Sequence, residues 1–198
     1  CCIGAQTVRS GRCSWESGRG GRAGDGHYRA CGSNEPEVDN VNIRDLCTRQ
    51  DLTPPRLAPA GIIGVLRFDA AGNRLAFGFE APTRPRYVFV LDIPSNHLDA
   101  WTHSEPGPVD PTKFVTPRVT QYPTFDRIDG RQRQIPMYVY EPASAGPHPV
   151  LITLHGGPES QFRPGFDPLL QYVVNELGFA VLAPNVRGSS GYGKSYLA

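Results

Sequence analysis

The chain has 198 residues, 39% of them hydrophobic, and its 20 Lys and Arg residues nearly balance its 19 Asp and Glu residues. This composition is typical of a soluble globular protein with one domain or two small ones. The formal charge of +1 excludes the strongly basic surface of most nucleic-acid-binding proteins. No apolar stretch approaches the roughly 20 residues that cross a bilayer. We therefore expect neither a nucleic-acid nor a membrane partner.

Residues 1–60 form a zone rich in glycine and arginine that also holds all five cysteines, namely Cys1, Cys2, Cys13, Cys31 and Cys47. Too few apolar groups are present to offset the entropy of ordering this zone, which predicts disorder. The cysteines show no paired C-x-x-C zinc pattern, so we expect free thiols and no metal. An RNA-binding arm and a cloning or reading-frame artefact are alternatives, although the acidic residues Glu35, Glu37 and Asp39 oppose the first.

Residues 61–118 change to an alternating apolar pattern, which predicts an antiparallel sheet. A hairpin is expected around the turn 69–73, where Gly72 and Asn73 would supply positive φ angles, and a third strand over 87–91. This meander is typical of a β-propeller blade, although any antiparallel sheet gives the same pattern. Prolines at 94, 106, 108, 111 and 117 then predict a connector over residues 92–120.

Residues 119–198 have the pattern of an α/β domain. A strand is predicted over 134–140, and the apolar runs 150–154 and 179–183 predict two buried strands. Between those runs, apolar residues at helical spacing predict a helix over 166–177, with Asp167 and Pro168 at its start and Gly178 at its end. The order strand, helix, strand predicts a right-handed crossover in a parallel sheet.

Two glycine-containing motifs follow the two apolar strands. His155-Gly156-Gly157-Pro158 lies where open α/β sheets bind ligands, and its amides could stabilise an oxyanion, although a glycine turn chosen for close packing fits equally well. The second motif, residues 185–193, reads Asn-Val-Arg-Gly-Ser-Ser-Gly-Tyr-Gly.

These two motifs in this order resemble the catalytic domain of prolyl oligopeptidase-family serine peptidases, especially the acylaminoacyl-peptidase-like and dipeptidyl-peptidase-like members. The resemblance covers about residues 61–198. It implies the α/β fold class: the start of an α/β-hydrolase domain at 119–198, preceded by β-propeller-like strands and a connector at 61–118 and by the disordered segment 1–60. It also implies hydrolysis of short peptides by a Ser, Asp and His triad, without a cofactor.

By the same resemblance, Gly157 corresponds to the oxyanion-hole backbone donor, and His155, Gly156 and Pro158 shape its turn. No Gly-x-Ser-x-Gly nucleophile motif occurs in these 198 residues. The triad is therefore expected beyond Ala198, and the chain alone is expected to be inactive with an uncovered apolar sheet edge. The other histidines, His27, His97, His103 and His148, are expected at the surface.

Two further interpretations stay open. Gly188–Ser195 also satisfies the phosphate-binding pattern G-x-x-x-x-G-K-[ST], in which Lys194 and Ser195 would contact nucleotide phosphates and magnesium. Alternatively, the chain is a non-catalytic interaction protein whose strands pair with other chains. The oligomeric state is not indicated by the sequence, and the cytoplasm is the default compartment.

Overall fold

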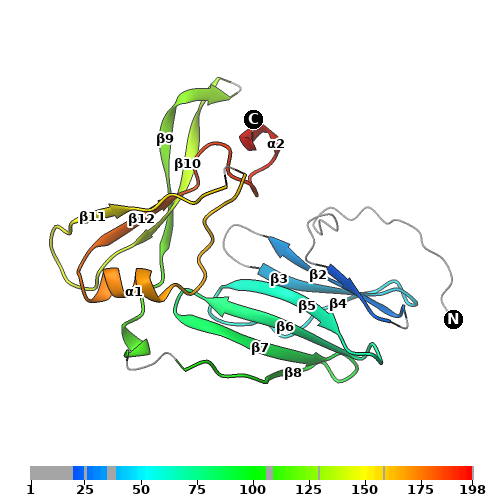
Figure 1. The fold of residues 1–198 in the computed structure, drawn as a ribbon. Coiled ribbons are helices and arrows are strands. Elements are labelled where there is room, and N and C mark those ends of the chain that lie inside the picture. Colours follow the sequence, from blue (N-terminus) through cyan, green and yellow to red (C-terminus); the bar gives the residue numbers. More distant parts are fainter. Residues whose placement is uncertain are drawn as a thin grey trace. The chain divides into compact units, whose positions relative to one another are not determined.

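Strands dominate the structure, a computed structural model that describes residues 20–24, 26–34, 39–105, 109–128, 130–157 and 159–197. They form three four-stranded sheets (Figure 1). The secondary structure of the described residues is thus mostly β-strand, whereas the sequence predicts an α/β fold class. The elements are β1 (Gly20–Arg22), β2 (Tyr28–Asn34), β3 (Asp39–Asp45), β4 (Asp51–Leu52), β5 (Ile62–Phe68), β6 (Arg74–Ala81), β7 (Arg84–Asp92), β8 (His97–Ala100), the 3-10 helix η1 (Pro111–Lys113), β9 (Arg118–Ile128), β10 (Arg131–Tyr140), β11 (Val150–Ile152), α1 (Pro168–Asn175), β12 (Ala180–Pro184) and α2 (Lys194–Leu197).

The first sheet, β1 to β4, lies within the zone where the sequence predicts disorder. That prediction is wrong for the described residues 20–60, and residues 1–19 lie outside the described part of the chain. The prediction of free thiols is also wrong for Cys31 and Cys47, because both are disulfide-bonded. Cys1, Cys2 and Cys13 lie outside the described residues. Few apolar groups are enough here because Ala30 and Ile43 join a core formed mainly by the next sheet.

The second sheet has the order β5-β6-β7-β8, and it confirms the predicted hairpin and third strand. Gly72 takes the expected positive φ of 78°, but Asn73 does not, since Asn96 and Arg49 are the described non-glycine residues with positive φ. The proposed connector over 92–120 is wrong at its start and end, where β8 and the first residues of β9 form strands. The prolines still lie outside β8, which pairs with β7 from Phe89↔Ala100 to Asp92↔His97.

The first and second sheets share one hydrophobic core. Its largest members come from β5, β6 and β7, where alternate residues such as Leu66, Leu75 and Phe79 are almost fully buried. Asp39 at the start of β3 is also buried, and its carboxylate accepts a hydrogen bond from the Ile63 amide at 2.9 Å. The Asp39 amide donates to the Gly61 carbonyl at 3.0 Å. The two bonds link the two sheets, and the bond from Ile63 gives the buried carboxylate a hydrogen-bond donor, without which its burial would be unfavourable.

The described residues fall into two units, the first within Cys1–Ala81 and Arg86–Glu105 and the second within Pro82–Pro85 and Pro106–Ala198. The second unit contains the third sheet, with the order β11-β12-β10-β9. Strands β11 and β12 run parallel, from Val150↔Ala180 to Ile152↔Leu182, as the strand, helix, strand pattern predicts. The sheet is mixed rather than parallel throughout, because β10 pairs antiparallel with both β12 and β9.

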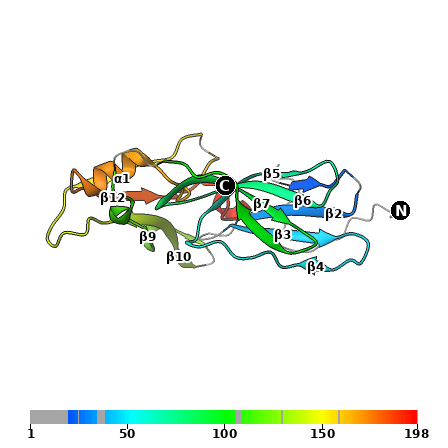
Figure 2. The ribbon, with the colours of Figure 1, turned by 90° about the horizontal axis from the view of Figure 1, so that it is seen from below.

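Helix α1 packs on one face of this third sheet (Figure 2). Leu170 and Val174 contact a core that includes Tyr140 and Val181, whereas the predicted apolar residues Leu169 and Leu177 are exposed. Its ends agree with the sequence, since Asp167 caps the first turn and Gly178 has a φ of 68°. The Asp167 carboxylate accepts hydrogen bonds from the amides of Leu169 and Leu170 at 2.9 and 3.1 Å.

Replacing Asp167 with alanine should lower the free energy of unfolding by about 1 kcal/mol, because two amides of the first turn lose their acceptor. Chemical denaturation of the variant and of the unchanged chain measures this difference. Asp167→Ser is the matched control, because serine also caps helices well and should retain most of the stability. Equal losses in both variants would show that the cap hydrogen bonds are not the source of the effect.

Strand β11 is an edge strand, and the prediction that residues 150–154 form a buried strand is wrong. Val150, Leu151 and Ile152 are 56%, 42% and 61% exposed. An apolar run of this kind is normally covered on both faces, but no described strand pairs with the outer side of β11. The uncovered apolar edge that the sequence predicts is therefore present. No described helix is long and apolar enough to span a bilayer.

Candidate active site

The two glycine motifs of the sequence meet at one edge of the third sheet. Strands β11 and β12 run in the same direction, and the Thr153 amide extends their pairing by donating to the Leu182 carbonyl at 2.9 Å. The loops that follow them therefore leave the sheet at their shared carboxyl end, which is where open sheets of this type bind ligands. We call residues 155–162 the first loop and residues 185–193 the second loop.

Three polar contacts join the first loop to the second. His155 Nε2 lies 2.7 Å from Ser189 Oγ. The Ser190 amide donates to the Ser160 carbonyl at 2.8 Å. The third contact is made by Asn185, whose side chain binds the backbone of Phe162. The first loop is thus attached to the second loop at three points along its length.

Asn185 is the most connected of these residues and is fully buried. Its Oδ1 accepts from the Phe162 amide at 2.7 Å, and its Nδ2 donates to the Phe162 carbonyl at 3.2 Å and to Tyr192 Oη at 2.8 Å. The Asn185 carbonyl accepts from the Tyr196 hydroxyl at 2.5 Å. A buried amide side chain is stable only when its donors and acceptors are paired, and these bonds satisfy both ends of Asn185.

Two tyrosines close the second loop around Asn185. The rings of Tyr192 and Tyr196 lie 5.1 Å apart, which agrees with the sequence-based expectation that Tyr192 packs nearby. Burial raises the pKa of Tyr196 to about 12. Burial also raises the pKa of Tyr192, against the opposing effect of the Asn185 hydrogen bond. Both hydroxyls are therefore neutral hydrogen-bonding groups at physiological pH and have no role as bases.

The predicted oxyanion-hole turn is open on its outer side. His155 is half-buried, Gly156 and Gly157 are exposed, and Pro158 lies outside the described residues. Among the described residues, a side chain at Gly156 would meet no atom within 4 Å, and one at Gly157 would meet only Ser160 at 3.8 Å. Close packing against the described residues therefore does not account for these glycines.

The backbone conformation at position 157 favours glycine, because a φ of 84° would be strained for any residue with a Cβ. None of the hydrogen bonds between described residues uses the Gly157 amide. An exposed amide in an open turn can donate to an anion, which is the chemistry that an oxyanion hole needs. The other histidines are exposed or half-buried and lie outside both loops.

The second loop does not have the arrangement of a phosphate-binding loop. Such a loop directs consecutive amides toward a phosphate. Here the amides of Gly188, Ser189 and Ser190 donate instead to the carbonyls of Tyr196, Val186 and Ser160, at 2.9, 3.0 and 2.8 Å. Helix α2 does follow the loop, but these three amides are occupied by the protein. The structure gives no support to nucleotide binding at Gly188–Ser195.

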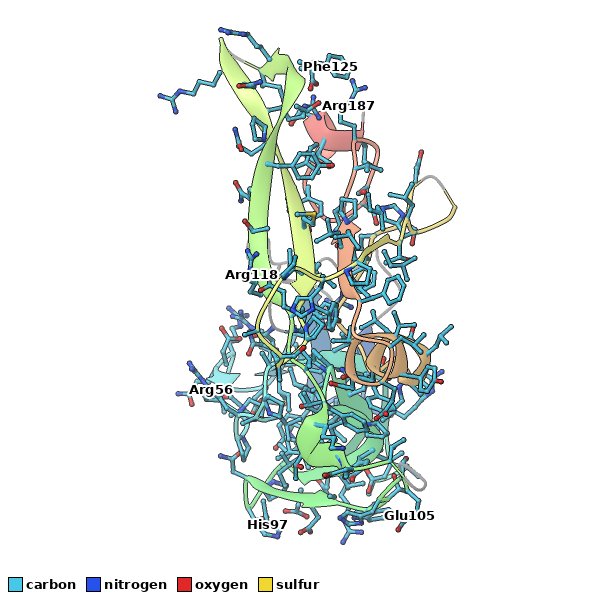
Figure 3. The ribbon with its side chains drawn as sticks, turned by 90° about the vertical axis from the view of Figure 1, so that its left-hand side faces the viewer. Arg56, His97, Glu105, Arg118, Phe125 and Arg187 are labelled. Carbon is cyan, nitrogen blue, oxygen red and sulfur yellow. The ribbon has the colours of Figure 1, made fainter. Side chains whose placement is uncertain are left out.

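A charged cluster beside the second loop was not found from the sequence. Asp126 on β9 lies 3.0 Å from Arg133 Nε and 3.7 Å from Arg187 Nη1. The Arg187 guanidinium also lies 4.8 Å from the centre of the Phe125 ring, and Figure 3 shows these two side chains together. Arg133 donates to the Ser195 carbonyl at 3.2 Å. The cluster ties the β9–β10 hairpin to the second loop, a contact for which residue spacing carries no signal.

Known proteins resemble this chain in sequence and in fold, although no family model matches it. The dipeptidyl peptidase family member 6 of Caenorhabditis elegans is 35% identical over 75 residues, which cover 38% of this chain and 9% of that protein. The solved puromycin-hydrolysing peptidase of Mycobacterium tuberculosis aligns with a TM-score of 0.71 and 21% identity over 90% of this chain and 27% of its own length. Prolyl oligopeptidase B of Galerina marginata gives a TM-score of 0.73 and 16% identity, over 89% of this chain and 24% of that one.

The structural likeness is one of fold, because these solved proteins are less than 25% identical to the chain. The local sequence match to a dipeptidyl peptidase points to the same group of enzymes. In sequence and in fold, the chain is similar to prolyl oligopeptidase-family peptidases, and it spans about a quarter of the length of the solved ones.

Proposed function

We propose that this chain is part of a serine peptidase of the prolyl oligopeptidase family that hydrolyses short peptides. The observation that carries this proposal is the junction of the two loops at the carboxyl ends of β11 and β12, with the Gly157 turn open beside them. In this assignment, residues 119–198 are the first part of an α/β-hydrolase domain. Residues 61–118 are the end of a propeller and its connector.

Gly157 is the proposed oxyanion donor. During acyl transfer, negative charge develops on the substrate carbonyl oxygen, and a preorganised amide stabilises it by roughly 3 to 4 kcal/mol. His155, Gly156 and Pro158 would hold the turn in place. The second donor of an α/β-hydrolase is the amide after the nucleophile, and no Gly-x-Ser-x-Gly motif occurs in these residues.

We therefore assign the nucleophile, the acid and the base to sequence outside residues 1–198. This assignment agrees with the share of the solved peptidases that the chain spans, 27% and 24%. The chain alone is then expected to be inactive. Its partner is a peptide substrate, and no cofactor is proposed. A cytoplasmic location stays a prediction, and the disulfide-bonded Cys31 and Cys47 are more typical of an oxidising compartment.

A fluorophosphonate probe, which reacts with activated serine hydroxyls, tests this proposal. Antibodies against the purified chain would isolate the natural polypeptide that contains it. We expect that polypeptide to be several times longer, to react with the probe and to cleave a dipeptidyl chromogenic substrate. The 198-residue chain should do neither and serves as the control. A natural polypeptide that does not react, or turnover by the short chain, would overturn the proposal.

A further inference from the structure

The position of the His155 ring depends on one serine hydroxyl in the second loop. Ser189 is fully buried, and its Oγ lies 2.6 Å from the Val186 carbonyl oxygen and 2.7 Å from His155 Nε2. A hydroxyl has a single hydrogen to donate, and a carbonyl oxygen only accepts. The Ser189 hydrogen is therefore directed to Val186, and His155 Nε2 must be the donor in the second bond.

This arrangement selects one tautomer of the neutral imidazole. With the proton on Nε2, Nδ1 carries a lone pair, and its contact with the Gly156 carbonyl at 3.3 Å is not a hydrogen bond while the ring is neutral. Among the contacts between described residues, the bond to Ser189 is then the one hydrogen bond that orients the neutral ring.

The orientation of His155 matters because the adjoining turn has little packing of its own. A side chain at Gly156 would contact none of the described residues, and one at Gly157 would contact only Ser160 among them. The turn is held instead from its two ends. One end is the His155 contact with Ser189, and the other is the Ser190 amide bond to the Ser160 carbonyl at 2.8 Å.

We propose that Ser189 is a positioning residue that fixes the tautomer and orientation of His155 and thereby holds the Gly157 amide in the geometry for oxyanion stabilisation. The last part of this inference rests on the proposed function. The alternative is a local role, in which Ser189 only stabilises the turn 186–189 through its amide and hydroxyl bonds to Val186.

NMR of the 15N-labelled chain distinguishes these roles without any enzymatic activity. Long-range 1H–15N spectra report which imidazole nitrogen carries the proton, and His155→Gln identifies the His155 signals. At about pH 8 we expect the neutral ring to carry its proton on Nε2. Ser189→Ala should remove this preference and should shift the resonance of the Gly157 amide, because the turn is no longer held by His155.

Ser190→Ala is the matched control, because Ser190 uses its backbone amide in the contact and its hydroxyl takes part in none of the hydrogen bonds between described residues. This variant should keep the Nε2 tautomer. A proton on Nδ1 in the unchanged chain would overturn the proposal even if Ser189→Ala did not fold. If folded Ser189→Ala kept the Nε2 tautomer, Ser189 would have only the local role, and the proposal would also be overturned.

The catalytic part is tested in the natural full-length polypeptide. There, Ser189→Ala should lower kcat by about tenfold to a hundredfold, with a smaller change in KM. Serine-probe labelling without an effect of Ser189→Ala on kcat would overturn the positioning role while leaving the proposed function intact. If NMR shows the proton on Nε2 and its dependence on Ser189, but the natural polypeptide does not react with the serine probe, the His155 contact stands and the peptidase assignment fails.

Discussion

Replacing Asn185 with leucine should lower the free energy of unfolding of the chain by about 3 to 5 kcal/mol. Leucine has the same branching and the same number of side-chain heavy atoms but cannot hydrogen-bond, so the backbone of Phe162 loses two bonds and the Tyr192 hydroxyl loses one. Each lost bond costs about 1 kcal/mol, and each buried group left without a partner adds about 1 to 3 kcal/mol. Chemical denaturation followed by circular dichroism gives the value.

Asn175→Ala is the control for this prediction. Asn175 is a partly buried asparagine in the same unit, and its side chain donates one hydrogen bond, to Gln171 Oε1 at 3.1 Å. We expect a loss of about 1 kcal/mol or less. If the two variants lost the same stability, the network around Asn185 would not be the element that joins the two loops.

The same substitution should also separate the two loops. Because Asn185 holds the backbone of Phe162, its loss removes one of the three points of attachment, and amide hydrogens of the first loop should exchange faster. Faster exchange confined to residues near 160–162 and 185–192 would support the network. Uniform acceleration over the third sheet would mean that the whole unit had been destabilised.

Gly61→Ala should destabilise the first unit by at least about 3 kcal/mol. Gly61 is buried just before β5, where a Cβ would lie 2.1 Å from the Glu80 carbonyl oxygen and 2.8 Å from Phe79 Cζ. The Glu80 atom belongs to the backbone of β6, so the strand itself would have to move, and forced overpacking of this kind costs 1 to 3 kcal/mol or more. The Gly61 carbonyl also accepts the hydrogen bond from Asp39 that links the two sheets.

Gly64→Ala is the matched control within β5. A Cβ there would lie 3.5 Å from the Gly78 carbonyl oxygen, which is an ordinary van der Waals distance. We expect a change of less than about 1 kcal/mol, measured by thermal unfolding of both variants. Similar transition temperatures for the two variants would show that β5 and β6 have room to separate at Gly61.

The sequence alone determined the elements whose signals are local. The apolar spacing of α1 and its Asp167 and Gly178 ends were predicted, because helix periodicity and capping depend on residues a few positions apart. The β5–β6 hairpin was predicted for the same reason. The two glycine motifs were placed after β11 and β12, and their order carried the resemblance to the peptidase family.

Only the tertiary structure decided which residues join those motifs. The contacts of Ser189 with His155 and of Asn185 with Phe162 span 34 and 23 residues, and no local pattern encodes such pairs. The same holds for β1 to β4, which look too polar to fold alone but bury Ala30 and Ile43 in the core of the next sheet. The burial of β11 was also misjudged, because an apolar run indicates what a strand prefers to contact, whereas its exposure depends on which strands lie beside it.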